Sequence, residues 1–213
     1  MFGLSASDLN VAAAVRGDHA RGPASGGITL LQYGDYQCPA TREAAAIVKR
    51  LDRQWAGRLR YVFRHFPQDT VHPQSWIAAE AAEAAAAQGK FWEMHALLLD
   101  RQHALYEDDL HQYAQELRLD TNRFALDLAT SRHAGLIYAA QATARADGID
   151  CTPTFFINGR RQDASSNFVT LSAAIEHEWF GRRPTPTPTP RPAAWEEFRA
   201  SPALIREIHK MVG

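Results

Sequence analysis

The side chain with the clearest chemical potential is the thiol of Cys38, which stands directly before Pro39. An apolar, β-prone segment ends just before this pair and an alanine-rich segment follows it, so the pair marks a corner between a strand and a helix. Proline suits the first position of a helix, because its missing N–H makes no helical hydrogen bond there. A cysteine at that corner faces unpaired backbone N–H groups and the positive end of the helix dipole, which favour a nucleophilic thiolate. An inert, buried thiol is the alternative interpretation.

Segments with strand and helix patterns place this corner within a fold. Residues 27–36 and 58–67 are predicted strands, and the helix that begins at Pro39 lies between them. Strand, helix and strand in this order indicate a βαβ unit with a right-handed crossover. Residues 73–147 have a helical pattern throughout, enough for about five helices, and a strand pattern returns at 153–162. The sequence therefore predicts an α/β fold with a helical insertion.

Composition bounds the class of protein. A chain of 213 residues with a net charge of −1 has no electrostatic reason to bind nucleic acid or an anionic membrane. No apolar stretch approaches the roughly 20 residues of a membrane helix, and residues 1–27 do not have the pattern of a signal peptide. The nine histidines form no metal-binding motif, so we expect neither a metal nor another cofactor. Two cysteines argue against a disulfide scaffold, and we expect a cytoplasmic protein.

Four ordered motifs give the chain a family resemblance. They are YGDYQCP at 33–39, RHFP at 64–67, GKFWEMH at 89–95 and TPTFFINGR at 152–160. Together they resemble the DsbA-like disulfide oxidoreductases of the thioredoxin superfamily over about residues 15–180. The resemblance implies a thioredoxin-like domain formed by 15–67 and 148–180, with an inserted helical subdomain at 68–147.

The resemblance also implies a set of site residues. Cys38 is the implied nucleophile, and a cis Thr152–Pro153 peptide is expected to pack against its sulfur. Pro39, Thr152 and Pro153 are then the substrate-binding residues, with the backbone of Thr152 pairing with an incoming peptide as a short added strand. A thiol-containing protein or a low-molecular-weight thiol is the expected partner.

Two departures from the family pattern affect the chemistry. The usual motif is C-P-x-C, and Thr41 occupies the position of the resolving cysteine. The family also usually has a buried glutamate six residues before the nucleophile, where this chain has Gln32. A mixed disulfide on Cys38 therefore has no second thiol in the next helical turn to release it, and two-cysteine chemistry is not expected.

Three ways of using a single thiol remain open. Cys151, two residues before Pro153, could resolve the mixed disulfide if its loop approaches within disulfide range. A small cellular thiol could resolve it instead, with the hydroxyl of Thr41 hydrogen-bonded to the Cys38 thiolate. The site could also be inert in a module that binds peptides. We expect a thiol–disulfide oxidoreductase with a single-cysteine site, the alternatives being the non-catalytic module and a thiol transferase or isomerase that acts on a small molecule.

The C-terminal third of the chain has three further patterns. Asn158-Gly159 is a favoured pair for a two-residue hairpin turn. Residues 181–192 alternate proline and threonine, which favours an extended linker. Residues 193–213 have an amphipathic helical pattern, so we expect a helical tail that docks on its own domain or is exchanged within a homodimer.

Overall fold

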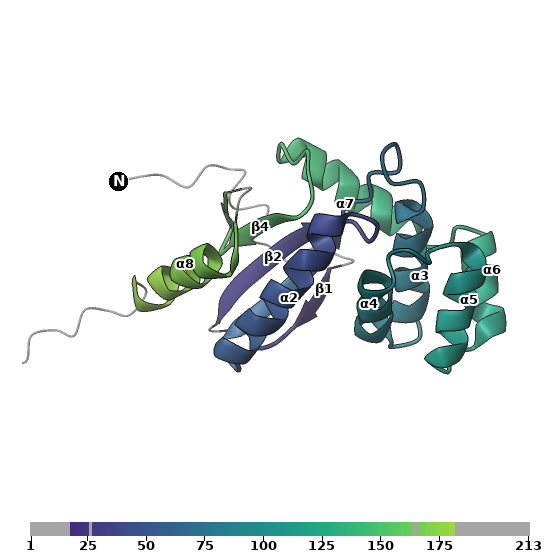
Figure 1. Cartoon of the computed structure of the whole chain (residues 1–213), viewed down its shortest axis with the longest axis horizontal. Helices are drawn as coiled ribbons and strands as arrows, with labels where there is room; N and C mark the ends of the chain where they lie inside the picture. Colours follow the sequence, from purple (N-terminus) through teal and green to yellow (C-terminus); the bar gives the residue numbers. More distant parts are fainter. Residues whose placement is uncertain (1–17, 26, 164–165, 182–213) are drawn as a thin grey trace, which may run out of the picture. The chain divides into compact units, whose positions relative to one another are not determined.

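The computed structural model describes residues 18–25, 27–163 and 166–181, and its centre is a five-stranded sheet. The strands, in chain order, are β1 (His19–Arg21), β2 (Ile28–Gly34), β3 (Leu59–His65), β4 (Thr154–Ile157) and β5 (Arg160–Arg161). Their order across the sheet is β1-β3-β2-β4-β5, of which Figure 1 labels β1, β2 and β4. β2 runs parallel to β3, and the other neighbouring pairs are antiparallel. The prediction of an α/β, thioredoxin-like fold is confirmed.

The predicted βαβ unit forms the middle of the sheet. Helix α2 (Pro39–Gln54) connects β2 to its parallel neighbour β3 and begins at Pro39, as predicted. The hairpin is also confirmed, because Asn158 and Gly159 both have positive φ between β4 and β5. The sequence did not predict β1. Its three residues are too few to show a strand period, and pairing with β3 defines them as a strand.

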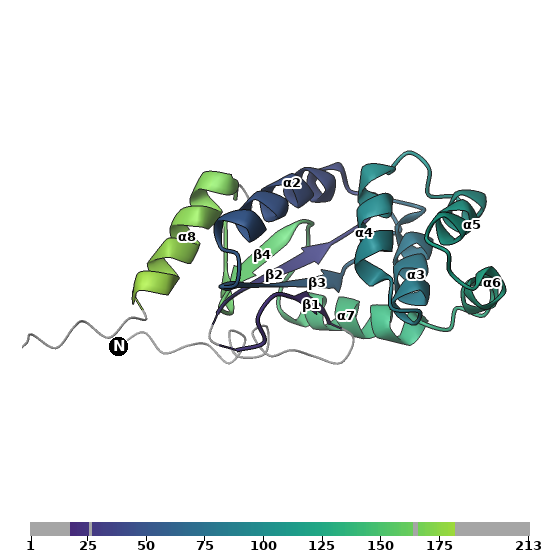
Figure 2. The ribbon, with the colours of Figure 1, turned by 90° about the horizontal axis from the view of Figure 1, so that it is seen from below.

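The helical stretch between β3 and β4 contains five helices, as predicted. They are α3 (Ser75–Ala86), α4 (Phe91–Asp100), α5 (Glu107–Glu116), α6 (Thr121–Ala129) and α7 (Ala134–Ala146). Figure 2 shows that α7 covers one face of the sheet and α2 the other, while α3 to α6 lie beyond one edge. α7 therefore packs directly on the sheet. The predicted end of the helical subdomain at residue 147 stays a prediction.

The two faces of β2 have different neighbours. Leu31 and Tyr33 pack with Ala144 of α7 in one buried cluster. The alternation of a strand turns the neighbouring residues, Gln32 and Gly34, towards α2. A Cβ on Gly34 would lie 2.4 Å from the ring of Phe63 and 3.1 Å from the methyl group of Thr41. Glycine at this point therefore lets the first turn of α2 approach the end of β2 closely.

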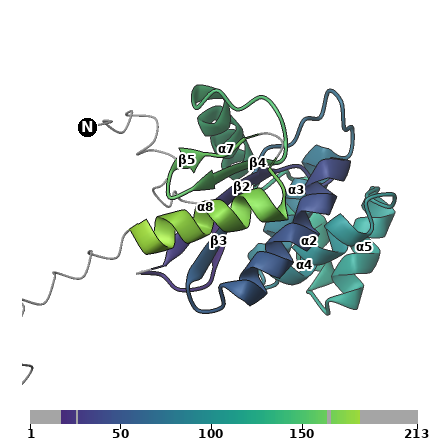
Figure 3. The ribbon, with the colours of Figure 1, turned by 60° about the vertical axis from the view of Figure 1, so that its left-hand side comes forward.

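The last described helix is α8 (Phe168–Gly181), which Figure 3 shows together with β4 and β5. Gln54 of α2 donates a hydrogen bond to Ser172 of α8 at 3.1 Å, so α8 and α2 are in contact. Within the described residues, no helix has both the length and the apolar character needed to cross a bilayer. The predicted linker beyond Gly181 and the predicted tail at 193–213 lie outside the described residues, so tail docking and the homodimer stay predictions.

Candidate active site

Cys38 is the residue that caps the N-terminus of α2. Its backbone is extended, with φ −73° and ψ 119°, and its N–H donates to the carbonyl oxygen of Asp35 at 3.2 Å. Its own carbonyl oxygen accepts the first helical hydrogen bonds, from Thr41 at 3.0 Å and Arg42 at 3.3 Å. The residue is 7% exposed. The strand–helix corner predicted from the sequence therefore exists, and Cys38 lies at its apex.

The Cys38 thiol lies against the loop that leads into β4. Its sulfur donates a hydrogen bond to the carbonyl oxygen of Thr152 at 3.2 Å, and the Thr152–Pro153 peptide bond is cis. The hydroxyl oxygen of Thr152 is buried and has no hydrogen-bond partner among the described residues. The structure thus brings Cys38 and Pro39 together with the Thr152–Pro153 loop, the arrangement that the resemblance implies.

Thr41 is fully buried in the first turn of α2, but it does not contact the thiol in the predicted way. Its hydroxyl oxygen accepts a long hydrogen bond, 3.4 Å, from the backbone N–H of Asp35. Within the part of the chain that the structure describes, no hydrogen bond joins the Thr41 hydroxyl to the Cys38 sulfur. The predicted stabilisation of the thiolate by Thr41 is therefore not formed here, because Thr41 turns towards β2 while the sulfur turns towards Thr152.

Gln32 is buried in the central strand, on the face of the sheet that α2 covers. Its side-chain oxygen accepts a hydrogen bond from the hydroxyl of Tyr61 at 2.7 Å. Burial raises the pKa of Tyr61 far above its ordinary value, so this hydroxyl stays protonated and donates. The buried position where the family usually has a proton acceptor therefore holds a neutral and fully engaged amide.

Cys151 lies next to Thr152 in sequence, and its thiol contacts Thr154. Its sulfur is 3.8 Å from the hydroxyl oxygen of Thr154. Thr154 is opposite Tyr33 in the β2–β4 pairing, and residues opposite each other share a face, which here is the α7 face. Both cysteines are free, Cys38 buried and Cys151 exposed. Among the described residues the Cys38 thiol is hydrogen-bonded to Thr152, the neighbour of Cys151, and the two cysteines form no disulfide.

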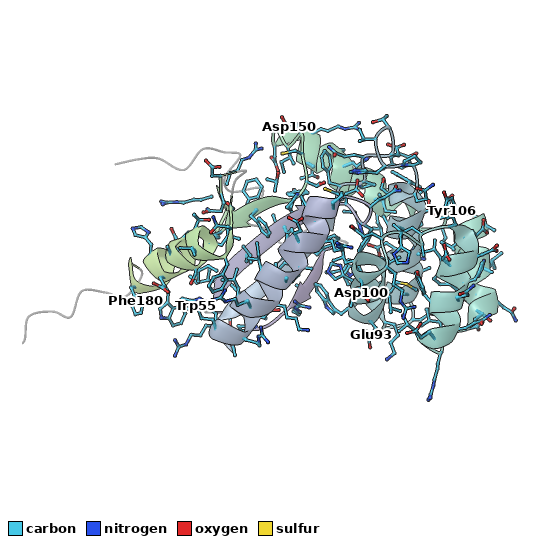
Figure 4. The ribbon with its side chains drawn as sticks, in the orientation of Figure 1. Trp55, Glu93, Asp100, Tyr106, Asp150 and Phe180 are labelled. Atoms are coloured by element: carbon cyan, nitrogen blue, oxygen red, sulfur yellow. The ribbon has the colours of Figure 1, made fainter. Side chains whose placement is uncertain are left out.

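A buried aspartate, Asp35, holds the turn before Cys38. One carboxylate oxygen of Asp35 accepts from the backbone N–H of Gln37 at 2.8 Å. The other accepts from the backbone N–H of Gln68 at 2.9 Å and lies 2.8 Å from Nδ1 of His72. The side chain of Gln68 then reaches the carbonyl oxygen of Asp150, which Figure 4 labels at the end of the sheet where α2 begins. His72 lies in an irregular loop, where no sequence pattern pointed to it.

Gln102 is a second positioning residue, and the sequence did not reveal it. It follows α4, and its side-chain amide donates to the carbonyl oxygens of Tyr36 at 2.7 Å and Cys38 at 2.9 Å. The helical insertion therefore fixes the backbone of the turn that carries the thiol. This contact joins residues 64 positions apart, so local patterns hold no signal for it.

A cavity of about 950 Å³ lies between α2 and α4. Arg42 and Lys49 of α2 line it, together with Glu93 and Asp100 of α4, which Figure 4 labels. Its lining includes neither Cys38 nor the Thr152–Pro153 loop. The cavity and the thiol are therefore separate features of the described part of the chain.

Comparison with known families agrees with this geometry. A family model described as Thioredoxin matches residues 14–177, which include every strand and the whole helical insertion. The chain belongs to the thioredoxin family. The predicted resemblance to its DsbA-like members is confirmed by the solved structures that share the fold.

Three of those solved structures have similar TM-scores against this thioredoxin-family chain. Oxidised BdbD from Bacillus subtilis has a TM-score of 0.70 at 20% identity, covering 78% of this chain and 94% of that one. Alpha-DsbA1 from Wolbachia pipientis has 0.71 at 16% identity, covering 82% and 96%. A thioredoxin-like oxidoreductase from Silicibacter pomeroyi has 0.68 at 27% identity, covering 76% and 92%. The helical insertion is thus part of a fold shared with whole proteins of this type.

Relatives of higher identity are much longer proteins. The chain is 44% identical over 175 residues to a protein named Na(+)/H(+) antiporter NhaA 1 from Salinispora arenicola, covering 82% of this chain and 27% of that protein. It is 40% identical over 166 residues to Na(+)/H(+) antiporter NhaA from Herminiimonas arsenicoxydans, covering 78% and 26%. The chain therefore spans about a quarter of the length of these relatives.

Proposed function

We propose that the chain is a thiol–disulfide oxidoreductase that acts through Cys38 as a single nucleophile. The observation that carries this proposal is the position of the Cys38 sulfur, at the N-terminus of α2 and 3.2 Å from the carbonyl oxygen of Thr152. A thiol there has the positive end of a 16-residue helix on one side and the Thr152–Pro153 loop on the other. Both features favour attack on a disulfide bound along that loop.

The reaction is a balanced exchange. The Cys38 thiolate attacks one sulfur of a partner disulfide, the partner S–S bond breaks, and a Cys38–partner disulfide forms while the other partner sulfur leaves as a thiolate and takes a proton. Because Thr41 offers no sulfur, release needs a second thiol from a protein or a small molecule. That thiol attacks the mixed disulfide, forms a new disulfide with the partner sulfur and restores the Cys38 thiolate, so one full cycle exchanges one thiol of the partner disulfide for another.

The unpaired hydroxyl of Thr152 supports a binding role for this loop. A buried polar atom without a hydrogen bond is unfavourable by roughly 1–3 kcal/mol, and it lies beside the thiol. A bound peptide can supply the missing partner and extend along the Thr152 backbone. Release of the Thr152 carbonyl oxygen from the Cys38 thiol, when the thiol ionises, leaves that oxygen free to accept from the peptide N–H.

A non-catalytic peptide-binding module is the second candidate. The burial of Cys38 and the engagement of its S–H by Thr152 favour it, since a thiol held as a donor is less reactive than a free thiolate. The substitutions at Thr41 and Gln32 are compatible with both candidates. The antiport activity in the names of the longer relatives is not part of either proposal, because the chain covers only about a quarter of their length.

Alkylation rates separate the two candidates. If exposure alone controls reactivity, iodoacetamide modifies exposed Cys151 before buried Cys38. We expect the reverse order at about pH 6.5, with Cys38 modified at least roughly tenfold faster, because the helix terminus favours its thiolate. Peptide mapping of samples quenched over time gives both rates. Cys151→Ser is the matched control and should leave the Cys38 rate unchanged, whereas faster modification of Cys151 in the wild type would favour the non-catalytic module.

A further inference from the structure

We propose that His19, His65 and Glu83 form a binding site for a divalent cation such as Zn²⁺. They come from β1, β3 and α3, so their meeting is a product of the fold. Nε2 of His19 lies 2.7 Å and Nε2 of His65 lies 2.9 Å from the same carboxylate oxygen, Oε1 of Glu83. All three potential ligand atoms lie within 4.8 Å of one another.

The donor set suits zinc in type and number. Two imidazole nitrogens and one carboxylate oxygen are a common three-residue set for Zn²⁺, with a fourth position left to water. Bonds of about 2.0–2.1 Å in a tetrahedral site place ligand atoms about 3.4 Å apart. The distance from the Glu83 oxygen would need to grow by about 0.7 Å to Nε2 of His19 and by about 0.5 Å to Nε2 of His65. The cation replaces the two N–H protons that now point at this oxygen, and these protons move to the other ring nitrogens or to solvent.

The charge at this point also favours a cation. Glu83 is a buried carboxylate, and its described ion-pair partners are His19 and His65. Nδ1 of His65 is buried with no hydrogen-bond partner in the described region. Buried charges in proteins are generally paired or bound to metals, and a cation at this point would pair with the carboxylate directly.

The surroundings are suited to holding an ion. The ring of His19 stacks on Phe91 with 3.4 Å between centroids, and Phe63 and Tyr36 contact the ring of His65 edge-on or tilted. These aromatic rings keep water away from the ligand atoms, which strengthens electrostatic attraction at the centre. The side chains of His65 and Glu83 are almost fully buried, while that of His19 is 16% exposed. His19 is therefore the side from which a cation and its water ligand enter.

The site is separate from the thiol, although Tyr36 lies between the two. Tyr36 precedes Cys38 by two residues, and its hydroxyl forms a hydrogen bond with Nδ1 of His95 at 3.0 Å, so that nitrogen of His95 is not free to be a further ligand. The proposed cation would tie β1, β3 and α3 together behind the turn that carries the thiol. Its expected role is structural.

Metal titration of the full chain tests this site directly. The background is Cys38→Ser/Cys151→Ser, which removes both thiols as competing ligands. We expect one equivalent of Zn²⁺ by calorimetry, a tetrahedral Co²⁺ absorption spectrum and a higher melting temperature with Zn²⁺. In the same background, Glu83→Gln and His19→Gln should each weaken Zn²⁺ binding at least roughly tenfold and abolish the rise in melting temperature.

Two comparisons keep the outcome clear. His72→Gln alters a histidine paired with Asp35, away from the proposed ligands, and should leave Zn²⁺ binding unchanged. Because Glu83→Gln removes a buried charge and can unfold the chain, the more exposed His19→Gln variant provides the independent result. The three residues would be only a hydrogen-bonded cluster if the background did not bind Zn²⁺, or if both ligand variants bound Zn²⁺ as tightly as the background does.

Discussion

Replacing Thr41 with cysteine is expected to raise the rate of insulin reduction with dithiothreitol at least about tenfold. The side chain at position 41 lies one helical turn after Cys38, so a thiol there attacks a Cys38 mixed disulfide within the molecule. Its effective concentration is in the millimolar range or above, beyond that of most thiols in solution. The wild type, which must wait for a second thiol, should be close to the background rate.

Gln32 extends this prediction. Gln32→Glu keeps the shape of the side chain and its acceptor for the hydroxyl of Tyr61, and adds a group that can take a proton. In the Thr41→Cys background it should raise turnover further, and in the wild type it should raise nothing, because there is no resolving thiol to deprotonate. A wild type as active as Thr41→Cys would mean that Cys151 already resolves the mixed disulfide.

Acid is expected to destabilise the chain through His95, by about 2 kcal/mol between pH 6.5 and pH 5. Burial, aided by the positive charge of Arg21 and by His65 and His19, lowers the pKa of His95 from 6.5 to about 3. The unfolded chain therefore binds a proton at His95 below about pH 6.5, while the folded chain does not until about pH 3. Stability is full above the unfolded value and is lost as the pH falls from about 6.5 towards 3, at about 1.4 kcal/mol per pH unit.

The matched variant is His95→Gln, whose side-chain oxygen can still accept from the hydroxyl of Tyr36. Urea unfolding between pH 6.5 and pH 5 should show that the His95→Gln variant loses much less stability than the wild type. Glu83 does not add to this loss of stability. Burial raises the pKa of Glu83, but its hydrogen bonds to His19 and His65 outweigh burial and lower the pKa to about 2. The contribution of Glu83 to stability is therefore lost only below about pH 4.5. His111→Gln, a change on α5, should leave the wild-type slope unchanged. An equal slope in His95→Gln would contradict the assignment to His95.

Local patterns were sufficient for the part of the fold that local chemistry determines. Pro39 set the start of α2, short apolar, β-prone runs set β2 and β3, and the pair Asn158-Gly159 set the hairpin turn. The three residues of β1 could not be predicted, because only their pairing with β3 makes them a strand.

The candidate site also contains residues that the sequence could predict and residues that it could not. Cys38 could be found from its position before Pro39, and the Thr152–Pro153 loop from the family motifs. The distant partners of the turn could not be found, since the contact of Asp35 with His72 joins residues 37 positions apart and that of Gln102 with Cys38 joins residues 64 apart. The direction of the Cys151 thiol depends on which face of the sheet Thr154 occupies, and that is decided by strand register.

The fate of a mixed disulfide tests the central claim most directly, because it shows whether Cys38 acts alone. Reduced wild type and Cys151→Ser are mixed with oxidised glutathione, quenched with acid over a time course, and examined by intact mass and peptide mapping. We predict that glutathione accumulates on Cys38, persists equally in both proteins, and is released only when a thiol is added. An adduct that decays in the wild type into a Cys38–Cys151 disulfide but persists in Cys151→Ser would contradict the single-nucleophile account, and so would the absence of any adduct on Cys38.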